Sequence, residues 1–410
     1  MKTLKFVFYC IFPLFILSGC WDQEEIEERA YVVVLGLDKS EDNLIDVTFQ
    51  IANPQRATSQ EADVQNEPPS DIVTITASDV LDAKELANTI VSREMNFDHL
   101  RTMIIEEELA KTELFPHILG SAIVDPEIRR DVNLIVSKEK ARKFIDKNKP
   151  KLETRPHKYY SFMVRRWIET AYSPQADINR YFLRISDELF LSVLATTEKN
   201  EHGPHPNVGY QVGEVPQKGG DPVQMVGSAV FKNGKMIGTL SGRETRIALF
   251  LRPKAVTYIQ TDTFPDPLDD NSHVTVRIIR NEDAKVKVNA KKDPVEIKVS
   301  VPVNLQVFSN PSLNNYTANK KNQELLKESI KKRMEENAMK LVKKTQEEFK
   351  GEPFLWYLAA RREFWTIQEF EDFAWEKKYL NADVQIDFDM EIESFGEMIE
   401  PPKINKHKVD

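Results

Sequence analysis

Residues 31–51 read YVVVLGLDKSEDNLIDVTFQI, and this stretch predicts the first two strands of a sheet. Its first seven residues are a compact run of β-branched and apolar side chains. Residues 44–51 alternate between apolar and polar side chains, as half-buried strands do. The polar residues 38–43 between the two runs indicate a turn. The N-terminal part of the chain is therefore expected to be built on a β-sheet.

Strands and helices alternate after this pair. Further strands are expected at residues 72–76, 99–106 and 131–137, and helices at residues 78–93, 109–124 and 159–172. Ser78 is the expected N-cap of the first helix. Residues 53–71 hold three prolines and many polar side chains, which is typical of a mobile loop. The alternation predicts a mixed α/β sheet with helices packed on it.

Residues 201–222 (EHGPHPNVGYQVGEVPQKGGDP) hold five Gly and four Pro, and they indicate the clearest domain boundary in the chain. Beyond them a β-hairpin is expected at residues 225–240 around Asn233-Gly234, followed by a short helix at 243–251. Further strands are predicted at residues 255–261, 273–280, 284–290 and 295–308. The remainder predicts a long amphipathic helix at residues 319–350, short helices at 353–362 and 366–377, and a closing strand at 384–392.

A length of 410 residues suits two or three domains. The expected fold class is α+β or mixed α/β: three domains, each a mostly mixed sheet flanked by helices, after a cleaved signal peptide. The predicted segments are a signal peptide at 1–19, an N-terminal α/β domain at 20–200, a linker at 201–222, a β-rich middle domain at 223–308, a C-terminal α/β domain with the long helix at 309–400, and a polar tail at 401–410.

The composition excludes several classes of protein. With 41% hydrophobic and 30% charged residues the chain is an ordinary globular one, and its net charge of −9 excludes a generally basic nucleic-acid-binding protein. The two cysteines, Cys10 and Cys20, are too few for a four-ligand zinc or iron–sulfur site.

The N-terminus has the pattern of a targeting segment. Lys2 and Lys5 precede the apolar run 6–17, FVFYCIFPLFIL, which as a helix would rise about 18 Å. That is short of the roughly 30 Å hydrocarbon core of a bilayer, so a signal-peptide core is favoured over a membrane span. No second apolar run is long enough to span a membrane.

The residues that follow, Leu17-Ser18-Gly19-Cys20, resemble the lipobox of bacterial lipoproteins. In that class a diacylglyceryl group is attached to the cysteine, here Cys20, and the chain is cut just before it. The alternative is an ordinary secretory signal, or a short anchor helix, with a chance cysteine at its end. Lipidation would remove Cys10 with the signal and leave no pair of thiols for a disulfide. Two acyl chains would hold the protein firmly at the outer face of a membrane.

No catalytic signature is present. The sequence has no phosphate-binding loop, GxGxxG, HExxH or GxSxG motif, so no enzyme, metal site or cofactor is predicted. His202 and His205 could share a metal, although a Gly/Pro-rich linker gives them no rigid frame. The acidic pair Asp269-Asp270 is expected in a polar loop. Asp387 and Asp389 are expected on the solvent face of a strand.

Two further clusters each have two interpretations. Between Lys138 and Arg166 there are eleven Lys or Arg against three acidic residues. They indicate a patch for anionic lipid headgroups or an acidic partner, or simply a solvated helix face balanced by acids elsewhere. Nucleic acid is excluded as a partner if the chain is exported. Trp356, Trp365 and Trp375 are either core residues or part of an exposed surface that binds a partner.

Several short motifs occur in order along the chain. They are Gly19-Cys20-Trp21-Asp22, Glu25-Ile26, Gly36-Leu37-Asp38, residues 227–232 (GSAVFK), Gly238-Thr239-Leu240 with Glu244, the Lys/Glu-rich helix, the Trp365–Trp375 spacing and Glu393-Ser394-Phe395-Gly396. This ordered set resembles the Ger(x)C family of spore germination lipoproteins. Together they cover nearly the whole exported chain. After Gly351 the chain departs from the family's Asp-rich helix opening and reads Glu352-Pro353-Phe354-Leu355-Trp356.

The resemblance implies a lipid-anchored C subunit of a nutrient germinant receptor. Such a subunit lies on the outer surface of the spore inner membrane beside membrane-embedded A and B subunits, in a complex that senses small nutrients. It implies a three-domain α/β fold and no catalytic residue; of the residues discussed, only Cys20 carries over, as the lipidation site. The resemblance leaves open whether this subunit contacts the nutrient, and which nutrient that is. The alternative function is a solute-binding lipoprotein of a transporter.

Overall fold

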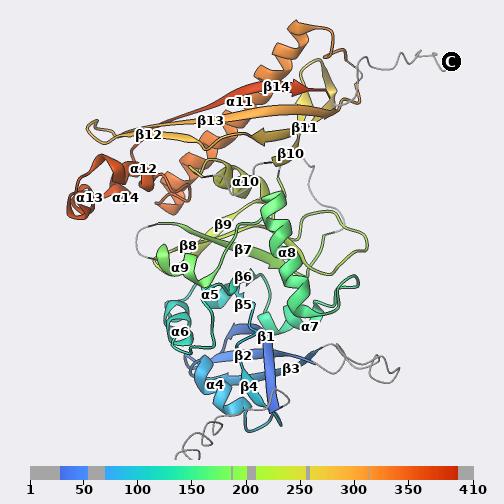
Figure 1. The fold of residues 1–410 in the computed structure, drawn as a ribbon, viewed down its shortest axis with the longest axis vertical. Helices are drawn as coiled ribbons and strands as arrows, with labels where there is room; N and C mark the ends of the chain where they lie inside the picture. The colour runs from blue at the N-terminus through green and yellow to red at the C-terminus, as the bar shows by residue number, and fades with distance from the viewer. Residues whose placement is uncertain are drawn as a thin grey trace, which may run out of the picture.

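The strands of the chain form two sheets that follow one another along the long axis of the molecule (Figure 1). The computed structural model describes residues 28–53, 70–185, 188–200, 209–254, 259–312 and 314–395. Within these residues both sheets contain parallel and antiparallel pairs, and helices pack on both of them. The expected fold class, mixed sheets flanked by helices, is confirmed.

The first sheet has the strand order β3-β2-β1-β5-β6-β7-β8-β9, with β4 beside β1. Its central strands run parallel, and antiparallel strands extend it on both sides. The strands are β1 (Arg29–Lys39), β2 (Ile45–Ala52), β3 (Ser70–Ala77), β4 (Glu94–Asn96), β5 (Thr102–Glu106), β6 (Asn133–Ser137), β7 (Phe190–Thr196), β8 (Gln224–Lys232) and β9 (Lys235–Leu240).

The helices described between β3 and β7 lie beside this sheet. They are α4 (Val80–Ala87), α5 (Glu107–Ala110), α6 (Leu114–Ala122), α7 (Ala141–Lys147), α8 (Pro156–Thr170) and α9 (Ile178–Leu183). In Figure 1, α4, α6 and α9 lie to the left of the strands, and α7 and α8 lie to the right. Because helices cover both sides, strands such as β5 and β7 are buried along their whole length.

The second sheet is built around the long strand β13. Strands β11 and β12 pair with different parts of β13, and β14 runs parallel to it. The strands are β10 (Ile259–Asp266), β11 (Asp269–Arg280), β12 (Lys285–Asn289), β13 (Glu296–Ser309) and β14 (Asp383–Ser394). The helices are α10 (Gly242–Phe250), α11 (Lys320–Lys344) with one π-helical turn at Thr345–Phe349, α12 (Tyr357–Ala360) with a 3₁₀ turn at Arg361–Glu363, α13 (Ile367–Phe373) and α14 (Trp375–Tyr379).

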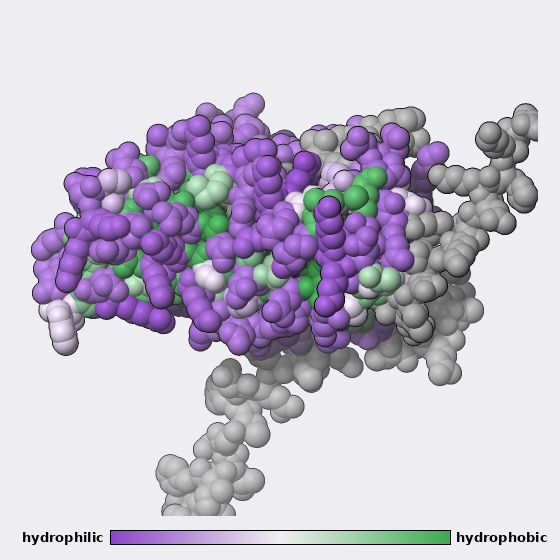
Figure 2. Space-filling model, turned by 90° about the horizontal axis from the view of Figure 1, so that it is seen from above, coloured by the Kyte–Doolittle hydropathy of each residue, from purple (hydrophilic) through white to green (hydrophobic). Residues whose placement is uncertain are grey.

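Local sequence signals predicted several elements of this second half closely. Asn233 and Gly234 both have positive φ (49° and 81°), as the tight turn of the β8–β9 hairpin requires. Helix α11 buries Leu326, Ile330 and Leu341 as its period predicted. Its Lys and Glu side chains face solvent, and hydrophilic residues cover most of the molecular face seen in Figure 2.

Other expectations were wrong at element ends. The helix expected at 78–93 ends at Ala87, and its N-cap is Asp79, whose carboxylate accepts from the amides of Leu81 and Asp82. The helix expected at 109–124 is two helices, α5 and α6, because Pro116 suits the first turn of a new helix and not the interior of a long one. Strand β10 runs to Asp266, beyond the expected end at 261, because it pairs with β11 over its whole length.

The strand pairing crosses the predicted linker. Strands β8 and β9, which the sequence assigned to a middle domain, extend the first sheet, because β8 pairs with β7 in antiparallel fashion. The residues of α7, α9, β4 and β7 were not predicted to form helices or strands. The division into three domains at 201–222 and 308 stays a prediction, and part of the first boundary, residues 201–208, lies outside the described residues.

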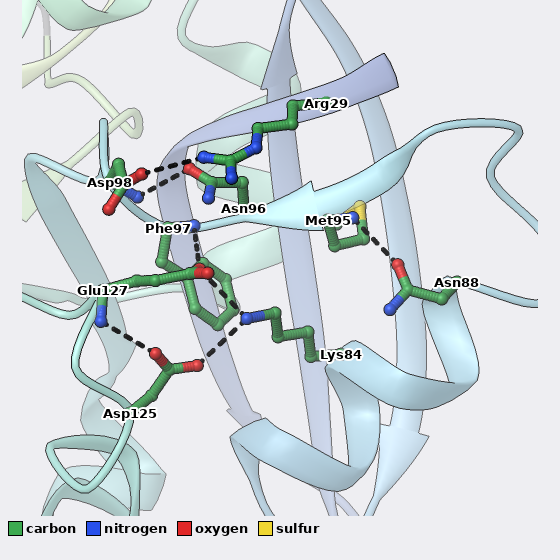
Figure 3. Close-up of polar contacts among 9 residues, drawn as sticks. All are labelled: Arg29, Lys84, Asn88, Met95, Asn96, Phe97, Asp98, Asp125 and Glu127. Atoms are coloured by element: carbon green, nitrogen blue, oxygen red, sulfur yellow. Dashed lines mark hydrogen bonds and ion pairs between the residues drawn. The ribbon is translucent and has the colours of Figure 1, made fainter. Parts of the chain in front are cut away.

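A partly buried ionic cluster connects the elements at the start of the first sheet (Figure 3). The ammonium of Lys84 on α4 lies 3.1 Å from Asp125 and 3.0 Å from Glu127, and it lies over the ring of Phe97 at 4.9 Å. Glu127 also accepts from the amide of Phe97 at 2.8 Å. The cluster therefore connects α4 to the turn before β6 and to the segment after β4.

The described residues form two hydrophobic cores, and the second core contains residues of both sheets. Leu191, Val230 and Leu240 of the first sheet belong to this second core, together with the apolar side chains of the second sheet. Among them lies Glu352, which is 3% exposed and accepts from the amides of Phe354 (2.7 Å) and Tyr357 (2.9 Å). Burial, with the nearby Glu188, raises the pKa of Glu352 to about 8.

The raised pKa of Glu352 predicts a pH dependence of stability. The folded protein binds this proton more tightly than the unfolded chain, whose carboxyl has a pKa near 4.5. The stabilisation is therefore complete below about pH 4.5 and is lost as pH rises through 8. Between pH 5 and 9 the free energy of unfolding of Glu352→Gln should fall less than that of the wild type, by on the order of 4 kcal/mol.

Urea unfolding of the purified chain at several pH values measures this difference. Glu347→Gln is the control, since Glu347 is exposed. It should follow the wild type, and parallel curves for wild type and Glu352→Gln would contradict the prediction.

Candidate interaction surface and cavity

Three of the predicted site residues lie outside the described part of the chain. They are Cys20, the expected lipidation site, and His202 and His205, the pair considered for a metal. Lipidation of Cys20 therefore stays a prediction. Within the described ranges, no group of three His, Cys, Asp or Glu side chains is placed to hold a metal ion.

Of the two acidic pairs, only one lies where it was expected. Asp269 and Asp270 lie in strand β11 and not in the expected polar loop, because β11 begins directly after the tight turn from β10 and Asp269 pairs with Asp266. Asp387 and Asp389 lie on the exposed side of β14, as expected. The carboxylate of Asp387 forms an ion pair with the ammonium of Lys331 on α11, at 2.7 Å. Both pairs therefore have the surroundings of surface carboxylates.

The basic segment from Lys138 to Arg166 forms α7, the following loop and most of α8. Many of its cations are paired with acids, as the solvated-face interpretation expected. The pairs are Lys138–Glu107, Arg142–Asp146, Lys143–Glu198, Arg155–Glu153 and Arg166–Glu169. These pairs are mostly exposed, so each contributes little to stability.

Helix α7 is held in place by two residues of β1. A Cβ on Gly36 would lie 2.9 Å from the Ile145 side chain and 3.2 Å from Ala141, so glycine is required for α7 to approach the strand. Two positions later, the carboxylate of Asp38 accepts from the amides of Ala141 and Arg142 in the first turn of α7. Asp38 thus caps a helix that lies 103 residues away in sequence.

The capping carboxylate is strongly buried. Burial and the neighbouring Glu106 raise the pKa of Asp38 to about 6, although the two amide donors favour its charged form. In the sequence, Gly36-Leu37-Asp38 was recognisable only as a motif of the family resemblance. Its capping role could not be predicted, because residues 141–147 had not been predicted to form a helix.

A cavity of about 590 Å³ lies between α7, the start of α8 and the edge formed by β2 and β3. Its walls include Arg142 and Lys149 as well as Asp71 and Asp146, so both charges are represented equally. Tyr159 contributes an apolar surface. The volume suits a small molecule, and the balanced charge does not select for an anion.

The capping role of Asp38 gives a stability prediction. Asp38→Ala removes the acceptor of two amide donors in the first turn of α7, and it should lower the free energy of unfolding by about 1–3 kcal/mol. Asp146→Ala is the matched control, because it removes an exposed carboxylate of the same helix that pairs with Arg142. It should change stability by roughly 0.5 kcal/mol or less. Denaturant unfolding compares the two, and equal losses would disprove the capping role.

The three tryptophans of the C-terminal part divide between the two interpretations. Trp356 and Trp375 are buried in the second core, as the core interpretation expected. Trp365 is 95% exposed, at the start of α13, where Ile367 is 65% exposed. The sequence spacing alone could not separate them, because each of the three lies just before or at the start of a short helix.

Truncation of these tryptophans should therefore have opposite outcomes. Trp356→Ala should destabilise the protein by about 3–5 kcal/mol, since it opens a cavity and removes the indole donor to the Leu251 carbonyl. Trp365→Ala should change stability by less than about 0.5 kcal/mol. Thermal or urea unfolding measures both, and a large loss in Trp365→Ala would mean that Trp365 is packed in solution.

None of the helices in the described ranges combines the length and the apolar character needed to cross a bilayer.

Two family models match the chain, in order and without overlap. Residues 22–196 match the spore germination protein N-terminal domain. Residues 226–396 match the C-terminal domain described as spore germination B3/GerAC like. Together the matches span most of the chain.

Individual proteins agree with the family models. Spore germination protein B3 of Bacillus subtilis (strain 168) is 22% identical over 413 residues, which covers 97% of this chain and 99% of that protein. Spore germination protein KC of the same organism is 28% identical over 138 residues, covering 33% of this chain and 34% of that protein. The crystal structure of the GerBC protein has a similar fold, with a TM-score of 0.54 and 16% identity, covering 88% of this chain and 96% of that one.

Proposed function

Because the chain belongs to the Ger(x)C family of spore germination proteins, we propose that it is the C subunit of a nutrient germinant receptor. The observation that carries the proposal is the ordered match of both family domains, which covers the described part of the chain almost completely. The similar fold of the GerBC protein supports it.

The subunit would be tethered to the outer face of the spore inner membrane through a diacylglyceryl group on Cys20. Strand β1 begins at Arg29, nine residues after Cys20. An extended segment of that length reaches about 30 Å. Tethering confines the protein to a thin layer beside the bilayer, so a modest affinity for the integral-membrane A and B subunits is sufficient.

The role we propose is association within the sensing complex, without catalysis. The exposed side chains of Trp365 and Ile367 at the start of α13 offer one surface for contacts with partner proteins. Helix α13 lies far from β1 in Figure 1. Small nutrients are the signals for the complex as a whole, and the proposal does not require that this subunit binds them.

Spores that lack this gene test the proposal. They should lose the response to one or more nutrients and keep the response to a non-nutrient trigger, which is the control for the rest of the germination pathway. The wild-type gene should restore the response, and a Cys20→Ala gene should restore it poorly, because its product stays unprocessed or leaves the membrane fraction.

Two results would contradict the proposal separately. An unchanged response to every nutrient in a strain without related receptor genes would contradict the receptor role and favour the solute-binding lipoprotein. Membrane-bound, acylated product from the Cys20→Ala gene would contradict the lipidation site alone.

A further inference from the structure

The loop between α7 and α8 carries an apolar side chain that the described residues leave uncovered. Leu152 is 94% exposed, more than any other large aliphatic residue in the described part of the chain. A single exposed leucine is common on protein surfaces and would mean little by itself. Its neighbours in the loop make this one informative.

Three lysines precede Leu152 at alternate positions. Lys147, Lys149 and Lys151 are exposed, whereas Asn148 between them is half-buried and Pro150 is buried. All three lysine side chains reach solvent, and that of Lys149 also lines the cavity beside α7. Within the described ranges none of the three forms an ion pair, although the neighbouring Arg142, Lys143 and Arg155 all do.

Two hydrogen bonds also connect the loop to the body of the protein. The Asn148 side-chain amide donates to the Tyr160 hydroxyl at 2.9 Å. The backbone amide of Lys151 donates to the Asp221 carboxylate, also at 2.9 Å. Because these contacts fix the inner side of the loop, its outer side presents one apolar group beside three unpaired positive charges.

This combination matches the surface of an anionic bilayer. In such an interface a leucine can enter the boundary of the acyl chains while lysines lie over the phosphates. The chain as a whole is negative, with a net charge of −9. An anionic membrane therefore repels most of its surface, and a local cationic loop decides which side faces the lipid.

We propose that residues 147–152 are a second membrane contact, in which Leu152 enters an anionic lipid surface and the three lysines pair with lipid phosphates. This inference rests on the proposed lipid tether at Cys20. The tether supplies the proximity, and the loop orients the tethered protein on the membrane.

A single labelled cysteine tests the contact on the complete lipoprotein. If Cys10 is removed with the signal and Cys20 is acylated, Leu152→Cys introduces the one free thiol of the mature chain. An environment-sensitive fluorophore is attached there, and the protein is reconstituted in vesicles of phosphatidylcholine with or without phosphatidylglycerol. Leu183→Cys is the matched control, because Leu183 is also strongly exposed (72%) and lies on a different helix, α9.

The expected result is specific to one position and one lipid. In vesicles with phosphatidylglycerol the label at position 152 should shift to shorter emission wavelength and be quenched by spin-labelled lipid. Both effects should be lost in neutral vesicles, at high salt, and when Lys147, Lys149 and Lys151 are replaced by Gln. The label at position 183 should respond in neither kind of vesicle.

Failure of the contact can be told apart from failure of the tether. The protein without an added cysteine should take up no label, and labelling of that protein would contradict acylation of Cys20. If it remains unlabelled and vesicle-bound, but the label at position 152 behaves like the one at 183, the membrane contact is wrong. The loop would then be available to an acidic protein partner. Quenching at 152 that does not depend on the three lysines would also overturn the proposal.

Discussion

The carbonyl groups at the end of α10 join the two halves of this protein. Helix α10 follows directly on β9, the last strand of the first sheet, and its final carbonyls are buried. The guanidinium of Arg280, from β11 of the second sheet, donates to the Phe250 carbonyl at 3.0 Å, and the Trp356 indole donates to that of Leu251 at 3.0 Å. Buried carbonyls at a helix end need such partners, and a cation is favoured there by the helix dipole.

Small residues let the two halves come close enough for this junction to form. A Cβ on Gly238 of β9 would lie 2.7 Å from the ring of Phe349, which follows α11. A Cβ on Gly351 would lie 3.1 Å from Leu189, just before β7. With Leu191, Val230 and Leu240 shared between the two groups of strands, the interface is a continuous core. The orientation of the second sheet on the first is therefore set by packing as well as by hydrogen bonds.

Close approach of a helix to a strand also positions the loop at residues 147–152, which faces the proposed membrane. Gly36 lets α7 lie on β1, Asp38 caps its first turn, and the chain that leaves α7 forms the loop that carries Leu152. A short helix of seven residues has little stability of its own, so its position depends on these tertiary contacts. A change at Gly36 or Asp38 would consequently displace the exposed loop without touching it.

The sequence alone determined the elements whose signals are local. Period-2 alternation marked β2 and β14, a 3.6-residue period marked α11, and Asn-Gly marked the β8–β9 turn, because each depends on neighbouring residues only. The family was likewise indicated by ordered short motifs.

Tertiary structure decided what depends on residues far apart. Strands β8 and β9 pair with the first sheet although the predicted linker separates them from it in sequence. Asp38 caps a helix 103 residues away. Trp356 is buried and Trp365 is exposed, although both lie beside short helices. Pairing partners and burial are set by which distant surfaces meet, and that is not encoded in any single window of sequence.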